Sequence, residues 1–169
     1  MYKMTYTYLQ KYKLKDSYFA ELGIEKTMKL NHHFYTPHEI DLSKAYDKLI
    51  PFPVELKIFY ETIGFGFMHR KNGDVNRIFD PVSLFMINLL QDDFQYNPEM
   101  RKIVEMYDIN KQLLFFQLQL GQYVVIDRHD ISGENAIYYH DEKLAGSLSE
   151  FIYTYHKNKN WLDDIVVRQ

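Results

Sequence analysis

Residues 50–68 read IPFPVELKIFYETIGFGFM, and their pattern predicts how a helix and a strand of the fold are joined. Pro53 has a fixed φ and lacks an N–H, which suits the first position of a helix. Apolar side chains then recur at the spacing of one helical face: they are Phe52, Leu56, Phe59, Tyr60 and Ile63. Gly64 marks the end of the helix, because glycine adopts the left-handed conformation without steric cost. Gly66, between two aromatic residues, is typical of the start of a strand. The stretch therefore predicts a helix with one buried face that turns directly into a sheet.

The composition limits the kinds of protein that this chain can be. The 169 residues suffice for one domain with its own core, since 46% of them are hydrophobic. A net charge of -3 provides no basic field for nucleic-acid phosphates. The absence of cysteine excludes disulfides, thiol nucleophiles and cysteine-based zinc sites. The N-terminus lacks the apolar segment of a signal peptide, and no apolar run approaches the ~18 residues of a membrane span. These features favour a soluble, cytoplasmic protein.

Capping signals place further helices along the chain. Thr36-Pro37-His38-Glu39 has the pattern of a capping box, and Ser147-Leu148-Ser149-Glu150 repeats it near the end. Asp80-Pro81 and Asn97-Pro98 each pair a capping side chain with a proline suited to the first helical position. Four helices are therefore expected in addition to the one after Pro53.

Strand signals alternate with these helices. Asn72-Gly73 between two apolar runs predicts a tight hairpin, because both central residues of a type I′ turn need positive φ. Apolar runs at 112–118, 123–127 and 136–139 predict three more strands, and the alternation over 4–9 suits a short N-terminal strand. Strands joined by short turns, with helices before and after them, predict an α+β fold with a single central antiparallel sheet. The core between helices and sheet is expected to contain Leu56, Phe59, Ile63, Val124, Ile126, Phe151 and Ile152.

No linker divides the sequence, so residues 1–169 are interpreted as one domain. Residues 1–36 are interpreted as an N-terminal extension and residues 157–169 as a charged C-terminal tail.

Four motifs, which follow one another along the chain, resemble those of the SUKH superfamily. This superfamily groups a yeast cell-wall-synthesis regulator with many bacterial immunity proteins. They are Ile50-Pro51 through Gly64-Phe65-Gly66, residues 76–81 (NRIFDP), residues 121–127 (GQYVVID) and the helix beginning at Ser147. The resemblance covers roughly residues 37 to 156. Its structural motif residues in this chain are Pro51, Gly64, Gly66, Asp80, Pro81, Gly121 and Tyr123.

The resemblance implies an α+β fold and a non-catalytic binding role. Bacterial members of the superfamily bind toxin domains, often nucleases, and neutralise them. The chain departs from the common pattern in its N-terminal extension and in Gln119-Leu120 before Gly121. Because of these departures, the resemblance does not indicate which partner this chain binds.

Two segments carry candidate partner-binding residues. Asp92, Asp93, Phe94 and Tyr96 lie on a polar break between helices and offer acidic and aromatic groups to a basic partner. The alternative for this segment is an exposed, capped loop. Asp127, Asp130 and Glu134 lie around the predicted hairpin, where a solvated loop that protects a sheet edge is the favoured alternative.

Catalytic and metal sites are not expected. The carboxylates between Asp127 and Asp141 could work as an acid–base pair in a small hydrolase, but such clusters are more often solvated loops. The seven histidines lack metal-ligand spacing, so we expect solvated or singly hydrogen-bonded rings, no metal and no cofactor. The favoured function is a non-catalytic immunity protein that binds and neutralises a toxin encoded nearby, with a nuclease expected as the toxin. The protein is expected to contact neither nucleic acid nor membrane. A regulatory or scaffold protein with a nontoxic partner is the alternative.

Overall fold

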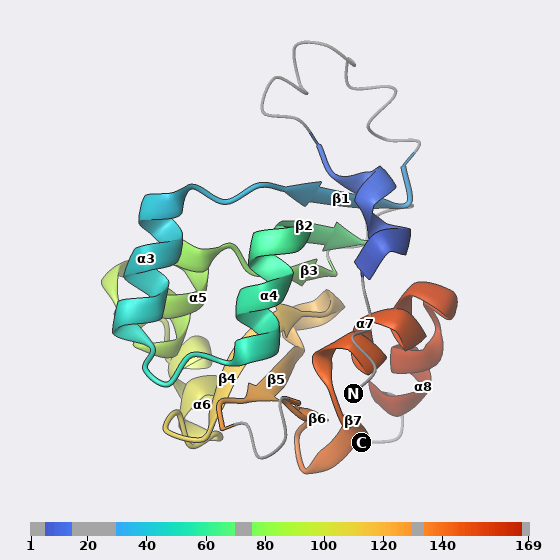
Figure 1. The fold of residues 1–169 in the computed structure, drawn as a ribbon. Coiled ribbons are helices and arrows are strands. Elements are labelled where there is room, and N and C mark those ends of the chain that lie inside the picture. The colour runs from blue at the N-terminus through green and yellow to red at the C-terminus, as the bar shows by residue number, and fades with distance from the viewer. Residues whose placement is uncertain (1–5, 15–29, 70–75, 130–133, 167–169) are drawn as a thin grey trace.

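The computed structural model describes residues 6–14, 30–69, 76–129 and 134–166. One seven-stranded antiparallel sheet organises these residues, and its strand order follows the chain order from β1 to β7. Helices lie before, between and after the strands (Figure 1). The predicted α+β fold with a single antiparallel sheet is therefore confirmed.

The strands are β1 (His32–Tyr35), β2 (Phe65–Met68), β3 (Arg77–Ile78), β4 (Gln112–Gln117), β5 (Tyr123–Asp127), β6 (Ile137–Tyr139) and β7 (Glu142–Ala145). The α-helices are α3 (Glu39–Lys48), α4 (Val54–Thr62), α5 (Pro81–Asn88), α6 (Pro98–Glu105), α7 (Leu148–Lys157) and α8 (Trp161–Val166). The 3₁₀ helices are η1 (Tyr6–Tyr12), η3 (Asp92–Tyr96) and η4 (Gln119–Gly121).

The helix predicted after Pro53 is α4, for which Pro53 is the N-cap residue. The side chains predicted for the core are all completely buried: Leu56, Phe59, Ile63, Val124, Ile126, Phe151 and Ile152. In β4, the four consecutive residues 113–116 are buried, so both faces of the sheet are covered there. The Phe151 ring of α7 contacts Phe115 and Phe116 at centroid distances of 5.8 and 5.5 Å. This contact closes α7 onto the centre of the sheet.

Two glycines of the opening stretch let the edge strand β1 approach β2. Gly64 and Gly66 have φ of 112° and 147°, a region that residues with a Cβ rarely occupy. A Cβ on Gly64 would lie 2.0 Å from the carbonyl oxygen of Tyr35, and one on Gly66 would lie 2.0 Å from that of His33. Both glycines thus serve backbone geometry, as predicted. The strand that they accommodate lies within the predicted N-terminal extension.

The helix caps follow the sequence signals with one exception. Asp80 accepts from the backbone N–H of Ser83 at 2.9 Å, and Ser147 accepts from that of Glu150 at 3.1 Å. Asn97 caps α6 in the same way. The capping box predicted at Thr36 is wrong, because α3 begins at Glu39 after His38, without a side-chain cap. Residues 36–38 are needed to lead the chain from β1 to α3.

The N-terminal strand prediction is also wrong, since Tyr6–Tyr12 forms the 3₁₀ helix η1. Tyr6 and Leu9 are buried three residues apart, and three residues make one turn of a 3₁₀ helix. The alternation of Thr and Tyr in this segment imitated the period of a strand.

The predicted hairpin turn at Asn72-Gly73 lies outside the described residues, but the pairing of β2 with β3 on either side of it is antiparallel. Strand β7 was not predicted, because an edge strand that begins with Glu142 and Lys143 lacks an apolar run. Helix α8 lies within the predicted tail and buries Leu162 and Ile165.

A buried asparagine completes the sheet where β3 is short. β3 has two residues, so on its β4 side it covers only the end of that strand, at residues 116 and 117. Asn88, at the end of α5, donates its amide to the carbonyl of Leu114 at 2.8 Å and accepts from the Leu114 N–H at 2.9 Å. The side chain of Asn88 therefore replaces a strand partner for β4.

None of the helices within the described ranges is long and apolar enough to cross a membrane.

Candidate functional site

The first candidate surface is η3, between α5 and α6. Leu90 and Asp92 have φ of 49° and 50°, so two residues with side chains adopt the left-handed conformation at this turn. Asp92 and Asp93 are exposed, and Tyr96 is 79% exposed. This arrangement presents two carboxylates and a phenol ring to solvent on a short, fixed segment.

Contacts with the rest of the molecule fix η3 in place. Phe94 is half-buried and packs against the core, so it supports the segment rather than standing out as the exposed aromatic group that we expected. Arg101 of α6 donates to the carbonyl oxygen of Gln95 at 2.7 Å. Because the segment is anchored at both points, a partner would bind it with little loss of conformational entropy.

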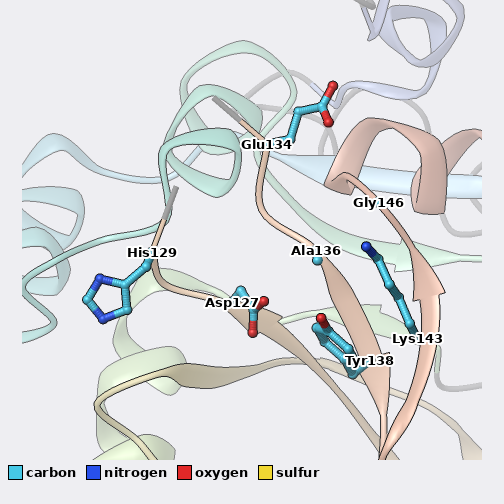
Figure 2. A pocket seen from close by; sticks show the side chains of 7 residues that line it. All are labelled: Asp127, His129, Glu134, Ala136, Tyr138, Lys143 and Gly146. Atoms are coloured by element: carbon cyan, nitrogen blue, oxygen red, sulfur yellow. The ribbon is translucent and has the colours of Figure 1, made fainter. Parts of the chain in front are cut away.

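The second candidate surface is a hollow of about 260 Å³ beside β5, β6 and β7. It is lined by Asp127, His129, Glu134, Ala136, Tyr138, Lys143 and Gly146 (Figure 2). In Figure 2 the imidazole of His129 points away from the carboxylate of Asp127. Asp130, a predicted site residue, lies outside the described residues. The hollow brings together Asp127 and Glu134, two of the three acidic residues predicted around this hairpin.

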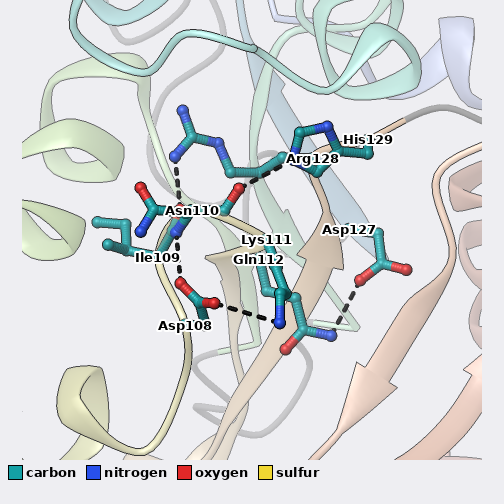
Figure 3. Close-up of polar contacts among 8 residues, drawn as sticks. All are labelled: Asp108, Ile109, Asn110, Lys111, Gln112, Asp127, Arg128 and His129. Carbon is teal, nitrogen blue, oxygen red and sulfur yellow. Dashed lines mark hydrogen bonds and ion pairs between the residues drawn. The ribbon is translucent and has the colours of Figure 1, made fainter.

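The carboxylate of Asp127 is already engaged within the protein. It accepts from the side-chain amide of Gln112 at 2.9 Å (Figure 3). Burial raises the pKa of the Tyr138 hydroxyl, and the nearby Asp127 carboxylate raises it further. Asp127 therefore interacts with both Gln112 and Tyr138 on this side of the hollow.

A buried carboxylate that the sequence did not reveal positions this hollow. Glu55 of α4 accepts from the backbone N–H of Asn135 at 2.7 Å and from that of Leu148 at 2.9 Å. The Asn135 side chain in turn accepts from the Glu55 N–H at 3.0 Å. Burial raises the pKa of Glu55, while these backbone donors favour its charged form. Glu55 thereby ties α4 to the start of α7 and to the residue after Glu134.

The strand end next to the hollow is fixed by Arg128, which is 6% exposed. Its guanidinium donates to the carbonyl oxygen of Ile109 (Figure 3). It also donates to that of Pro51, and burial lowers the pKa of Arg128. His129 lies 3.0 Å from the carbonyl oxygen of Asn110, which it can reach only as a donor. The Pro51 motif and the β5–β6 hairpin are thus connected directly.

The remaining motif residues have structural positions. Pro81 begins α5 after its cap Asp80. Gly121 ends η4 between β4 and β5 with φ of 74°. Tyr123 begins β5, and its hydroxyl donates to the Met100 sulfur at 3.3 Å. Among the described residues, no hydrogen bond connects these motif residues to η3 or to the hollow.

The histidines differ from the expectation of solvated or singly bonded rings. His32, His33 and His69 are buried, and His32 and His69 belong to a hydrogen-bonded cluster. The sequence could not reveal this, because the cluster joins segments far apart along the chain. Within the described ranges, no group of three or more His, Asp or Glu side chains is arranged to hold a metal ion.

A curated relative shows to which proteins the chain is similar. The chain is 31% identical over 136 residues to the immunity protein YxxD of Bacillus subtilis (strain 168). The match spans 79% of this chain and 89% of the relative. No protein-family model matches the chain, and no solved structure matches it. Since the match spans most of both sequences, the chain belongs to the immunity-protein family of YxxD.

Proposed function

We propose that this protein binds a protein toxin and neutralises it by covering the surface through which the toxin acts. The relationship to the immunity protein YxxD carries this proposal. The binding role requires no catalytic group in this chain.

The finer part of the proposal concerns the toxin and its compartment. A nuclease needs a basic surface for the phosphates of its substrate. This chain has a net charge of -3 and presents exposed carboxylates at Asp92, Asp93 and Glu134. We therefore propose a nuclease as the toxin, the cytoplasm as the place of binding, and membership of the SUKH superfamily as the origin of the fold.

Co-expression with the toxin domain encoded beside this gene tests the proposal. The expected result is that the toxin alone stops growth, that this protein restores growth, and that the purified pair forms a stable complex. Inhibition of the toxin's nuclease activity in the same mixture would support the finer part. If growth stays arrested while both proteins are soluble and unbound, the proposed function is wrong for this pair.

A second experiment separates binding from catalysis. The purified protein is incubated alone with a nucleotide and an ester substrate, and product is measured over time. We expect no turnover above that of the buffer. Turnover at an enzyme-like rate would contradict occlusion as the mechanism.

A further inference from the structure

A cluster of three histidines, two of them buried and the third half-buried, joins the start of the sheet to the last part of the core. His32 lies on the edge strand β1, His69 follows β2, and His156 lies near the end of α7. His32 is completely buried and His69 is 5% exposed. Asn31 lies between two of the rings. We name Asn31, His32, His69 and His156 the histidine latch.

The hydrogen bonds of the latch determine where each ring carries its proton. The backbone N–H of His69 donates to Nδ1 of His32 at 3.0 Å, so the proton of a neutral His32 is on Nε2. That Nε2 lies 2.8 Å from Nδ1 of His156, which must therefore accept. Nε2 of His69 lies 2.6 Å from the carbonyl oxygen of Tyr155, which can only accept, so His69 donates there. The amide nitrogen of Asn31, which can only donate, lies 3.2 Å from Nδ1 of His69, so this nitrogen accepts. All three rings are thus neutral and carry their proton on Nε2.

A second proton would break these hydrogen bonds. On His32 it would occupy Nδ1 and face the N–H of His69. On His156 it would occupy Nδ1 and face the Nε2–H of His32. In each case two donors would point at one another, and the completely buried His32 could not replace its lost bond with one to water. The closed latch therefore excludes protons that a free histidine would bind.

The surroundings of the latch add to this exclusion. From η1, the positive charge of Lys11 lowers the pKa of His32. The Tyr12 ring of the same segment contacts His32 at a centroid distance of 4.6 Å. The Tyr8 ring contacts His156 at 5.0 Å. Within the described residues, the cluster is also faced by His33 from β1 and by Tyr155 and Lys157 from α7. Burial lowers the pKa of His32 to about 3, and burial and the nearby lysine lower that of His156.

We propose that the histidine latch is a proton-sensitive lock that holds η1 and β1 to α7 at neutral pH and releases them on acidification. The closed state contains neutral rings, whereas the open state exposes them to water and lets them bind protons. Protons therefore act as a ligand of the open state alone. This inference concerns the stability of the N-terminal segment and does not depend on the proposed function.

The sign and size of the effect follow from the two pKa values of His32. The closed value is about 3 and the open value is the ordinary 6.5, so the open state binds more protons between these limits and stability falls as pH falls. Between pH 7 and pH 5, His32 alone shifts the opening equilibrium about 25-fold toward the open state. Protonation of His156 would increase this shift.

Hydrogen exchange of the backbone amides tests the lock. Protection of residues 6–14 and 32–35 is measured at pH 7 and pH 5, with correction for the intrinsic exchange rate. We expect protection in these segments to fall at least 25-fold, while β4 and β5 stay protected. An equal loss of protection in all strands, or no selective loss at the N-terminal segments, would overturn the proposal.

Substitutions identify the latch as the cause. The double variant His32→Asn/His156→Asn offers carbonyl acceptors that bind no proton, so most of the pH dependence should disappear. His38→Asn is the matched control, because His38 is exposed and outside the latch, and it should behave like the wild type. Retention of the full pH dependence in the double variant, or its loss in the control, would contradict the latch.

A measurement on the wild type covers the case in which the double variant does not fold. The ring signals of His32 are followed by NMR from pH 8 to pH 5. They should keep the neutral Nε2–H form in the folded protein. Titration of the folded His32 ring with a midpoint near 6.5 would overturn the proposal.

Discussion

Phe59 links three parts of the core through one ring. It makes edge contacts with Tyr6 of η1 at 4.9 Å and with Phe34 of β1 at 5.9 Å between ring centroids, and it is completely buried. Phe59→Ala should lower the free energy of unfolding by about 3–5 kcal/mol, because it removes transfer energy and leaves a cavity. Denaturant unfolding provides the measurement.

The preceding residue on the same helix is a control for Phe59. Ile58 is 42% exposed, so Ile58→Ala should change the free energy of unfolding by only about 0.5 kcal/mol or less. Equal destabilisation by the two variants would show that α4 does not bury the face described.

Apolar residues were easier to predict than buried polar ones. The spacing from Phe52 to Ile63 identifies one buried face without knowledge of any distant partner. Glu55 interrupts that face, and a carboxylate at a helix start ordinarily indicates solvent. Its burial depends on donors at Asn135 and Leu148, 80 and 93 residues further on. Such partners leave no local pattern.

At the scale of elements, the pairing of β1 with β2 requires that residue 66 be a glycine, which has no side chain. Gly66→Ala should detach or displace β1, because the new Cβ would meet the His33 carbonyl oxygen at 2.0 Å. We expect a loss of several kcal/mol in unfolding free energy and faster amide exchange in β1, since backbone on both sides of the clash would have to move. Gly121→Ala is the control: its φ is 74°, but no atom lies within 4 Å of its Cβ position, so it should cost only about 1 kcal/mol. A similar cost for both variants would mean that close approach is not what requires Gly66.

The contact of α5 with β4 gives a second test at this scale. Asn88→Leu would leave both the N–H and the carbonyl of Leu114 without the partner that they now share. Each buried unsatisfied group costs about 1–3 kcal/mol, so this substitution should destabilise more than most core changes of similar volume. Leu84→Met, a change at a completely buried position of the same helix, should cost less than about 1.5 kcal/mol. The expectation fails if the two variants unfold at the same denaturant concentration.

Elements with local signals were predicted, and elements defined by their neighbours were not. The capping residues Asp80, Asn97 and Ser147 indicate where their helices begin, because a cap acts within three residues of sequence. β1 consists of His32–Tyr35 and β7 begins with two charged residues, so neither has a typical strand composition. Both are strands because an adjacent strand offers its free edge.

For the whole molecule, recognition should depend on exposed charge. Asp92→Lys/Asp93→Lys should weaken binding to the toxin and reduce its salt dependence, because rim charges mainly speed encounter. Association rates at two salt concentrations provide the measurement, and the melting temperature should stay near that of the wild type. Asp163→Lys/Asp164→Lys makes the same charge change at an exposed pair on α8 and should have a smaller effect. Equal effects of both pairs would show that overall charge, rather than η3, guides the partner.

The shapes of the two candidate surfaces could be predicted only in outline. The sequence indicated acidic segments at 92–96 and 127–134, and the structure shows a fixed platform at one and a hollow at the other. It did not indicate that Phe94 turns inward, because an aromatic residue beside two aspartates suits either an exposed or an anchoring role. Side-chain direction in such a segment depends on the packing of α5 and α6.

The order of strands in the sheet has a consequence for synthesis on the ribosome. Each strand pairs with the one made just before it, so the sheet can grow in the direction in which the chain emerges. The core does not close in this way, because Phe151, Ile152 and Tyr155 belong to α7 and are made after all seven strands. Until α7 emerges, the apolar surface around Phe115 and Phe116 lacks its cover. We therefore expect a nascent chain that stops before residue 148 to bind chaperones, and one that includes residue 157 and has fully left the exit tunnel to be released from them.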